Sequence, residues 1–233
     1  MNTRGYQAAA RTNVGAGVGE NANDILWVTY RWMSVGLGVT GLVAWLVSQS
    51  PAAIELVLGN RIVFYALLIA QLGMVFTFSA VATRASTAVT GAMFLAYAAL
   101  TGVTFSVLFL VYTRSSIAST FLLTAGTFAG LSVFGAVTKR DLSGVGRFAI
   151  FALIGLILAS VVNMFLASPA LMWVTTFAGI LIFAALTAYD TQKLKAMYAA
   201  GAGGNLALRG ALTLYLDFIN LFLFLLRLTG RRR

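Results

Sequence analysis

Residues 206–228 read LALRGALTLYLDFINLFLFLLRL. A helix of this length crosses the hydrocarbon core of a bilayer, which takes about 20 predominantly apolar residues. The one acidic residue in the stretch, Asp217, lies near its middle, where a charge costs on the order of 3 kcal/mol on insertion. The stretch therefore predicts a transmembrane helix that carries a functional polar group.

Six further apolar runs of similar length precede this one, with short polar breaks between them. Two breaks contain the only prolines of the chain, Pro51 and Pro169. We therefore expect an all-α integral membrane protein, a bundle of seven transmembrane helices. The expected spans are Trp32–Ser48, Ile62–Thr83, Ala88–Tyr112, Ile117–Val137, Phe148–Ala167, Ala170–Gln192 and Leu206–Leu228.

The composition agrees with a membrane protein, because 60% of the 233 residues are hydrophobic and only 9% are charged. Soluble domains carry about 25% charged residues. There is no Cys and no His, which excludes disulfides, thiolate chemistry and histidine metal sites. The net charge of +10 comes from basic residues between the apolar runs. We therefore expect contact with the lipid bilayer, no nucleic-acid partner and no cofactor.

Residues 1–24 are rich in Gly, Ala and Asn and lack an apolar run, so we expect a disordered tail and no secretory signal. With seven spans, ten of the 16 Lys and Arg lie on the N-terminal side and six on the other. Positive charge concentrates on the cytoplasmic side, so the N-terminus is expected there. If the last segment only dipped into the membrane, the split would be fourteen against two; its length favours a full span.

Asp190 and Asp217 stand out among the six acids, because the other four lie in the tail or in loops. If the sixth helix continues to Tyr198, Asp190 lies roughly 12 Å from the helix end, and Asp217 lies roughly 16 Å inside the seventh. Two carboxylates facing each other in a low dielectric are expected to share a proton. Such a pair is expected to be proton-sensitive. It suits a transit or gating site for a cation better than a tight Ca²⁺ cage, which takes about six to eight oxygens.

Thr213 and Asn220 fall on the Asp217 face of the last helix, at spacings of four and three residues. Arg84 ends the second helix and has two possible roles. It either snorkels to the membrane interface or reaches the aspartates as a latch. The structural alternative is that the buried acids pair with Arg84 or Arg209 and only hold the bundle together. In the fourth helix, Gly126-Thr-Phe-Ala-Gly130 predicts close helix packing.

Four segments resemble the Bax inhibitor-1 (transmembrane Bax-inhibitor-motif) family over about residues 25–230. The two most specific are the segments that contain the aspartates. The segments are Leu214-Tyr-Leu-Asp217-Phe-Ile-Asn220-Leu-Phe, Ala188-Tyr189-Asp190-Thr-Gln-Lys193, Lys139-Arg-Asp-Leu142 and the opening of the first helix from Tyr30-Arg-Trp-Met.

The resemblance implies a seven-helix bundle with the last helix central and a pH-sensitive Ca²⁺ leak channel. Asp190 and Asp217 would be its proton sensor and ion path, Arg84 the latch, and Tyr189 a supporting polar residue. Bacterial relatives are also described as modulators of a membrane-bound quality-control protease, partly through a cytoplasmic tail. Where the family often has an acid in the second helix, the nearest polar residue here is Gln71.

Other functional classes fit less well. An intramembrane aspartyl protease needs a Gly-x-Gly-Asp motif, and Leu214-Tyr-Leu precedes Asp217 instead. A retinal photoreceptor needs a lysine deep in its last helix, which this chain lacks. Paired broken helices typical of transporters are not evident either. We therefore expect no enzyme, and either a proton-gated Ca²⁺ leak channel of the inner membrane or a non-conducting protease modulator.

Overall fold

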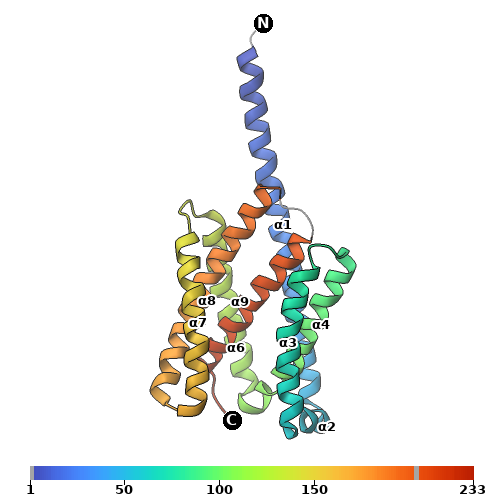
Figure 1. The fold of residues 1–233 in the computed structure, drawn as a ribbon, viewed down its shortest axis with the longest axis vertical. Coiled ribbons are helices and arrows are strands. Elements are labelled where there is room, and N and C mark those ends of the chain that lie inside the picture. The colour runs from blue at the N-terminus through green and yellow to red at the C-terminus, as the bar shows by residue number, and fades with distance from the viewer. Residues whose placement is uncertain (1–2, 202–204) are drawn as a thin grey trace.

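The computed structural model describes residues 3–201 and 205–233 as a bundle of helices (Figure 1). Seven helical spans in this part of the chain are long and apolar enough to cross a membrane, which confirms the all-α membrane fold. The elements are α1 (Thr3–Ser48), α2 (Pro51–Ile54), the π-helix η1 (Glu55–Gly59), α3 (Arg61–Val81), α4 (Thr87–Phe105), α5 (Leu108–Val111), α6 (Arg114–Val137), α7 (Ser143–Leu166), α8 (Pro169–Ala199) and α9 (Leu206–Thr229).

Polar residues in the breaks determine where several helices begin. Ser86, Thr113 and Ser168 precede α4, α6 and α8, and each hydroxyl accepts a hydrogen bond from the backbone N–H three residues later. Pro169 stands at the first turn of α8, where its missing N–H costs no helical bond. These caps explain why hydropathy placed most boundaries within a few residues of the observed ones.

Several bounds differ from the expected ones, most clearly in the third and sixth spans. The third span is broken after Phe105, where Ser106 Oγ donates to the carbonyl of Val103 at 2.7 Å, and it resumes as α5. The sixth span continues past Gln192 to Ala199, so the helix carries its polar end out of the apolar region.

The sequence analysis expects a disordered tail over residues 1–24, of which residues 1 and 2 lie outside the part of the chain that the structure describes. The structure continues α1 back to Thr3, and this part projects beyond the bundle (Figure 1). The physical reason is that no proline interrupts the segment, and extending an existing helix needs no new nucleation. Composition alone does not show that this segment continues the helix of the first span.

Helix α9 occupies the centre of the bundle and packs against α8, α1, α6 and α4. In Figure 1 it runs between the α7–α8 pair and the α3–α4 pair. Helix α3, in contrast, packs mainly on α4, and Phe78 is its one buried residue. The central last helix implied by the family resemblance is therefore present.

The chain ends lie at opposite ends of the bundle, so α9 crosses it completely (Figure 1). At the C-terminal end, the amide of Thr113 donates to the carbonyl of Arg231 at 3.1 Å, and the amide of Arg233 donates to the carbonyl of Val111 at 3.0 Å. These bonds attach the C-terminus beside the start of α6. They favour seven full spans over a last segment that dips and returns.

The close packing predicted at Gly126 and Gly130 is wrong. A methyl group built on either glycine would meet nothing within 4 Å, because this face of α6 points out of the bundle. The glycine that allows a close crossing is Gly135, where an added Cβ would collide with the carbonyl of Ala188 on α8. The GxxxG spacing gave no information about which face points inward.

Candidate functional site at the α8–α9 interface

Asp190 on α8 and Asp217 on α9 meet across the interface of these helices. Their carboxyl groups lie within hydrogen-bonding range of each other. Asp217 is only 5% exposed, and its Oδ2 has no hydrogen-bond partner. A contact between two carboxyl groups needs a proton between them, because two buried like charges in contact repel strongly. The structure therefore places two carboxyl groups where their charges interact directly.

The pairing follows from equal depth on adjacent helices. Asp190 lies nine residues before Ala199, the end of α8, and Asp217 lies eleven residues after Leu206, the start of α9. At about 1.5 Å per residue these positions are roughly 14 and 17 Å from the same end of the bundle. The turn that connects α8 and α9 is short, so the two helices run antiparallel and place the carboxyl groups side by side.

Helices α1, α8 and α9 pack closely between the aspartate pair and the N-terminal end of the bundle. A Cβ added to Gly210 of α9 would lie 2.8 Å from Leu194 Cδ2 on α8 and 3.2 Å from Thr29 Cγ2 on α1. Thr29 is fully buried, and its hydroxyl has no partner. These contacts separate the aspartates from the aqueous end of the bundle.

On the other side of the pair, aromatic rings fill the centre of the bundle. Phe218 packs against Phe121 and Phe128 of α6, with ring centroids 5.3 and 5.4 Å apart. Tyr215 is fully buried, and its hydroxyl lies 2.7 Å from Thr40 Oγ1 on α1. Packed side chains therefore lie on both sides of Asp217, while Asp190 is half-buried.

The structure does not bring Arg84 to the aspartates. It lies exposed in the turn after α3, and this turn is bonded to Asn205 at the start of α9. Asp217 lies twelve residues further along α9, roughly 18 Å deeper and beyond the reach of an arginine side chain. Neither the latch nor the stapling pair with Arg84 is formed in this conformation.

The other sequence-predicted residues bond elsewhere. Thr213 Oγ1 donates to the carbonyl of Arg209 at 3.1 Å, and Asn220 Nδ2 donates to the carbonyl of Leu216 at 2.8 Å, so both bond back to α9 itself. Tyr189 packs on α7, where Gly146 leaves room for its ring. Gln71 Nε2 donates to Thr104 Oγ1 at 3.3 Å, between α3 and α4. The site is therefore narrower than the predicted set, and consists of the aspartate pair.

Asn205 is a residue that the sequence analysis missed. Its Nδ2 lies 2.8–3.1 Å from the carbonyls of Ala82 and Ala85 and from Thr90 Oγ1, while its Oδ1 accepts from Thr87 Oγ1 at 2.8 Å. It precedes α9 but makes no capping bond to it. This side chain ties the α3–α4 turn to the central helix. An Asn at a helix start signals a cap, and only the fold shows the more distant partners.

Gln192 plays a similar part on the other side of α8. Its Oε1 accepts from the amide of Leu142 at 2.9 Å, and its Nε2 donates to the carbonyl of Arg140 at 2.8 Å. The side chain thereby binds the α6–α7 turn to α8. Gln192 itself lies two residues after Asp190 in the sequence. Both turns that flank the site are held by single amide side chains.

The comparisons with known proteins agree on one family. The family model described as inhibitor of apoptosis-promoting Bax1 matches residues 22–233. The chain is similar to the inner membrane protein YbhL of Escherichia coli K12, with 52% identity over 210 residues, which cover 88% of this chain and 90% of YbhL. A Deinococcus radiodurans protein is 47% identical over 208 residues, covering 88% and 89%. A Borreliella burgdorferi protein is 40% identical over 216 residues, covering 91% and 93%. This multi-span membrane protein therefore belongs to the Bax inhibitor-1 family.

Proposed function

We propose that the protein is a pH-sensitive cation leak channel that passes Ca²⁺ and is gated by Asp190 and Asp217. The observation that carries the proposal is the contact of two carboxyl groups between packed helices, with Asp217 Oδ2 left without a partner. An unpartnered buried oxygen is costly and rarely kept in a purely structural network. It provides an acceptor for water or a cation when the helices separate.

The gate works by the loss of the shared proton. With the proton in place, the carboxyl groups attract each other and α8 and α9 stay packed. Without it, two adjacent negative charges repel, and the cheapest response is to admit water and a cation between the helices. Arg84 does not reach the pair here, and Lys193 is a nearby positive charge on α8. Repulsion between the two carboxylates sets the direction in this proposal, so conduction is expected to rise with pH.

The pair suits passage better than storage of Ca²⁺. Two carboxylates offer four oxygens, while Ca²⁺ takes about six to eight. No cluster of three or more Asp, Glu, Cys or His side chains occurs among the residues searched, which are those that the structure describes. Water therefore has to complete the coordination, and the ion is held weakly enough to leave.

The inner membrane is the proposed location, by analogy with YbhL. The N-terminus is placed in the cytoplasm, as the excess of Lys and Arg on the N-terminal side favours. In this orientation the pair lies nearer the cytoplasmic end, with Leu194 and Gly210 between it and the cytoplasm.

The test is Ca²⁺ flux into liposomes that contain the purified protein, across about pH 6 to 8. Flux that rises with pH in the wild type and becomes independent of pH in Asp190→Asn and Asp217→Asn would support the gate. Arg84→Ala is the matched control and should behave as wild type. A wild-type flux that falls as pH rises, together with a flux independent of pH in Arg84→Ala, would show that an Arg84 latch controls the gate and that carboxylate repulsion does not. No flux above empty liposomes at any pH would reject the channel.

A second candidate is a non-conducting modulator of a membrane-bound quality-control protease. The observation that favours it is the helical extension of α1 from Thr3, which projects from the bundle (Figure 1) and is accessible to a partner. A modulator needs this extension and tolerates changes at the aspartates. Deletion of residues 2–23 separates the two functions, because a channel should keep its flux and a modulator should lose its effect on proteolysis.

A further inference from the structure

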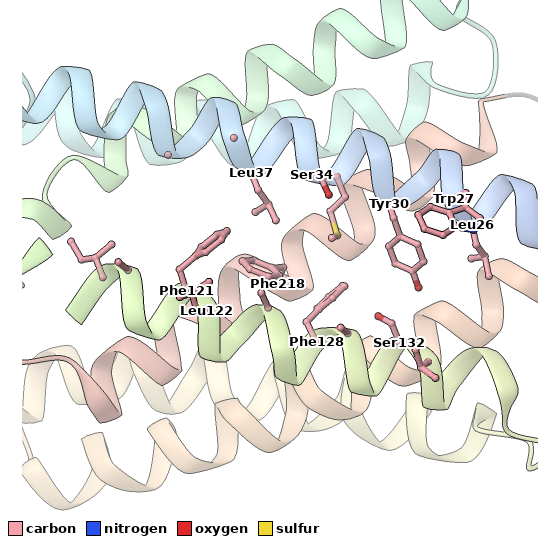
Figure 2. Close-up of a pocket in the computed structure, with 18 of the residues that line it drawn as sticks. Leu26, Trp27, Tyr30, Ser34, Leu37, Phe121, Leu122, Phe128, Ser132 and Phe218 are labelled. Carbon is pink, nitrogen blue, oxygen red and sulfur yellow. The ribbon is translucent and has the colours of Figure 1, made fainter. Parts of the chain in front are cut away.

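Helices α1 and α6 enclose a groove of about 1240 Å³ with Phe218 of α9 in its wall (Figure 2). Both helices are membrane spans, so the groove lies inside the bilayer. Its volume exceeds the roughly 300–1,000 Å³ of typical small-molecule pockets. Leu122 and Val133 line it and are largely exposed, so it opens toward lipid. This shape suits an elongated ligand that enters from the membrane.

The groove is apolar along most of its length, with Arg114 at the end beside the start of α6 and hydroxyl groups near the opposite end. Met33, Leu37 and Phe128 give it hydrocarbon walls. Ser132 breaks this pattern, because it is 5% exposed and its Oγ has no hydrogen-bond partner. Figure 2 shows Ser132 on α6 and Tyr30 on α1 pointing toward each other into the groove. A buried hydroxyl without a partner indicates a ligand that carries an acceptor or donor at this point.

The polar end lies at the depth of lipid ester groups. Tyr30 is six residues from the start of the first span at Asp24, and Ser132 is five residues from the end of α6. These positions are about 8 to 9 Å from the helix ends. Spans of 24 and 25 residues exceed the roughly 30 Å core by a few ångström at each end. The two hydroxyls therefore lie just inside the core boundary of the N-terminal side.

A lysine ammonium group lies near the polar end of the groove. Lys195 Nζ donates to the carbonyl of Ala136 at 2.9 Å, and Ala136 lines the groove. Among the described side chains no carboxylate pairs with Lys195. An ammonium group has three donors, so two remain after the bond to Ala136. An ammonium group with free donors therefore lies beside Ala136, four residues along α6 from Ser132.

We propose that this groove binds one anionic phospholipid of the leaflet on the N-terminal side. The phosphate contacts Lys195, the glycerol ester region contacts Ser132 and Tyr30, and an acyl chain lies against Phe128 and Leu37. The proposal is independent of ion conduction. It places a lipid chain against Phe218, the neighbour of Asp217, and so gives lipid composition a route to the aspartate pair.

The test is native mass spectrometry of the purified protein in detergent, with phosphatidylglycerol or phosphatidylcholine of identical acyl chains added. The wild type should retain one phosphatidylglycerol in preference to phosphatidylcholine. Lys195→Gln should reduce this preference about fivefold, the value of one basic residue at an anionic surface. Lys193→Gln is the matched control, because Lys193 lies on the same helix over the Tyr189 ring, whereas Lys195 is bonded to the groove residue Ala136.

Filling the groove should abolish retention of both lipids. Gly38 lines the groove and has nothing within 4 Å of an added Cβ, so Gly38→Leu adds bulk without a clash. Ala129→Phe is a second filling variant on the opposite wall, and a wild-type melting temperature shows that each variant is folded. Equal retention of the two lipids by the wild type, or an equal loss of preference in Lys193→Gln and Lys195→Gln, would overturn the proposal. A dimer without bound lipid that Gly38→Leu dissociates would also overturn it, because the groove would then hold a helix of a second copy.

Discussion

Helices α9 and α3 are almost equally apolar and have opposite surroundings. Their most apolar windows have mean hydropathies of 1.8 and 2.0, yet 56% of the α9 window is buried in the protein and only 6% of the α3 window. In a bilayer, lipid satisfies an apolar side chain as well as a protein core does, so hydropathy does not decide burial. The two helices differ in charge, because α9 carries the carboxyl group of Asp217 near its middle whereas α3 has no charged residue after Arg61 at its start.

The difference also assigns different roles to the two helices. The central helix holds the carboxyl pair in a fixed position, whereas α3 is held mainly by α4 and by the turn that Asn205 binds. Elements with few buried contacts are those that open at low free-energy cost. We therefore expect α3 to move more readily than α9, and the following predictions test this contrast.

The largest effect is expected at Gly135, where α6 crosses α8. Gly135→Val places a branched side chain against the Ala188 carbonyl, so the helices must separate. The expected loss of stability is about 3 kcal/mol or more. Gly126→Val, on the open face of the same helix, should cost less than about 0.5 kcal/mol. Thermal unfolding in detergent measures both, and equal losses would show that the assignment of the two faces of α6 is wrong.

A direct comparison of the two helices uses leucine truncation. Leu214 on α9 is 0% exposed and Leu72 on α3 is 61% exposed. Leu214→Ala leaves a cavity and should lower the free energy of unfolding by about 2 kcal/mol, the low end of the usual range because the reference environment is apolar. Leu72→Ala should have almost no effect, since lipid fills the space. Similar losses in chemical unfolding would contradict the peripheral position of α3.

Asn205→Ala should loosen the link between the two regions. It removes the bonds to the carbonyls of Ala82 and Ala85 and to two threonine hydroxyls, at an expected cost of about 1–2 kcal/mol. Hydrogen exchange should rise in the α3–α4 turn and in α3, and stay unchanged in the centre of α9. Gln71→Ala, which removes one 3.3 Å bond, is the milder control. Exchange that rises equally throughout the bundle would indicate global destabilisation and not a local link.

The smallest effect is expected at Asp141, outside both regions. Hydrogen bonding from the Ser143 side chain, and then from the Ser143 amide at 2.9 Å, lowers the pKa of Asp141. A group whose pKa is lowered by folding stabilises the protein above its unfolded value of about 3.9 and loses this contribution as pH falls through the folded value. The melting temperature of wild type should therefore fall slightly more between pH 5 and 3 than that of Asp141→Asn. Identical pH dependence in the two proteins would show that the bond contributes nothing.

The sequence predicted the number of spans, most helix starts and the depth at which Asp190 and Asp217 meet. These features depend on local information, namely apolar run length, capping residues and distance along adjacent helices. The sequence did not predict the inward face of α6 or the partners of Asn205, which lie more than 110 residues away along the chain. Such partners depend on which helices are neighbours, and hydropathy in a membrane does not contain that information.

The helical state of residues 3–23 did not follow from the sequence for a related reason, and Arg84 takes the exposed position, one of the two that the sequence left open. Each depends on the state of an adjoining element, the first span in one case and the α3–α4 turn in the other. A motif match identifies a residue as important in relatives and does not fix its contacts in one conformation.

The central claim is that Asp190 and Asp217 hold one proton between them. Infrared difference spectroscopy tests it most directly, because the C=O stretch of a protonated carboxyl group is distinct and the chain has only six acids. The account predicts one such band near pH 6 that is lost as pH rises, and that is absent in Asp217→Asn but retained in Asp141→Asn. A spectrum without this band at any pH between 6 and 8, or a band that persists in Asp217→Asn, would contradict the account.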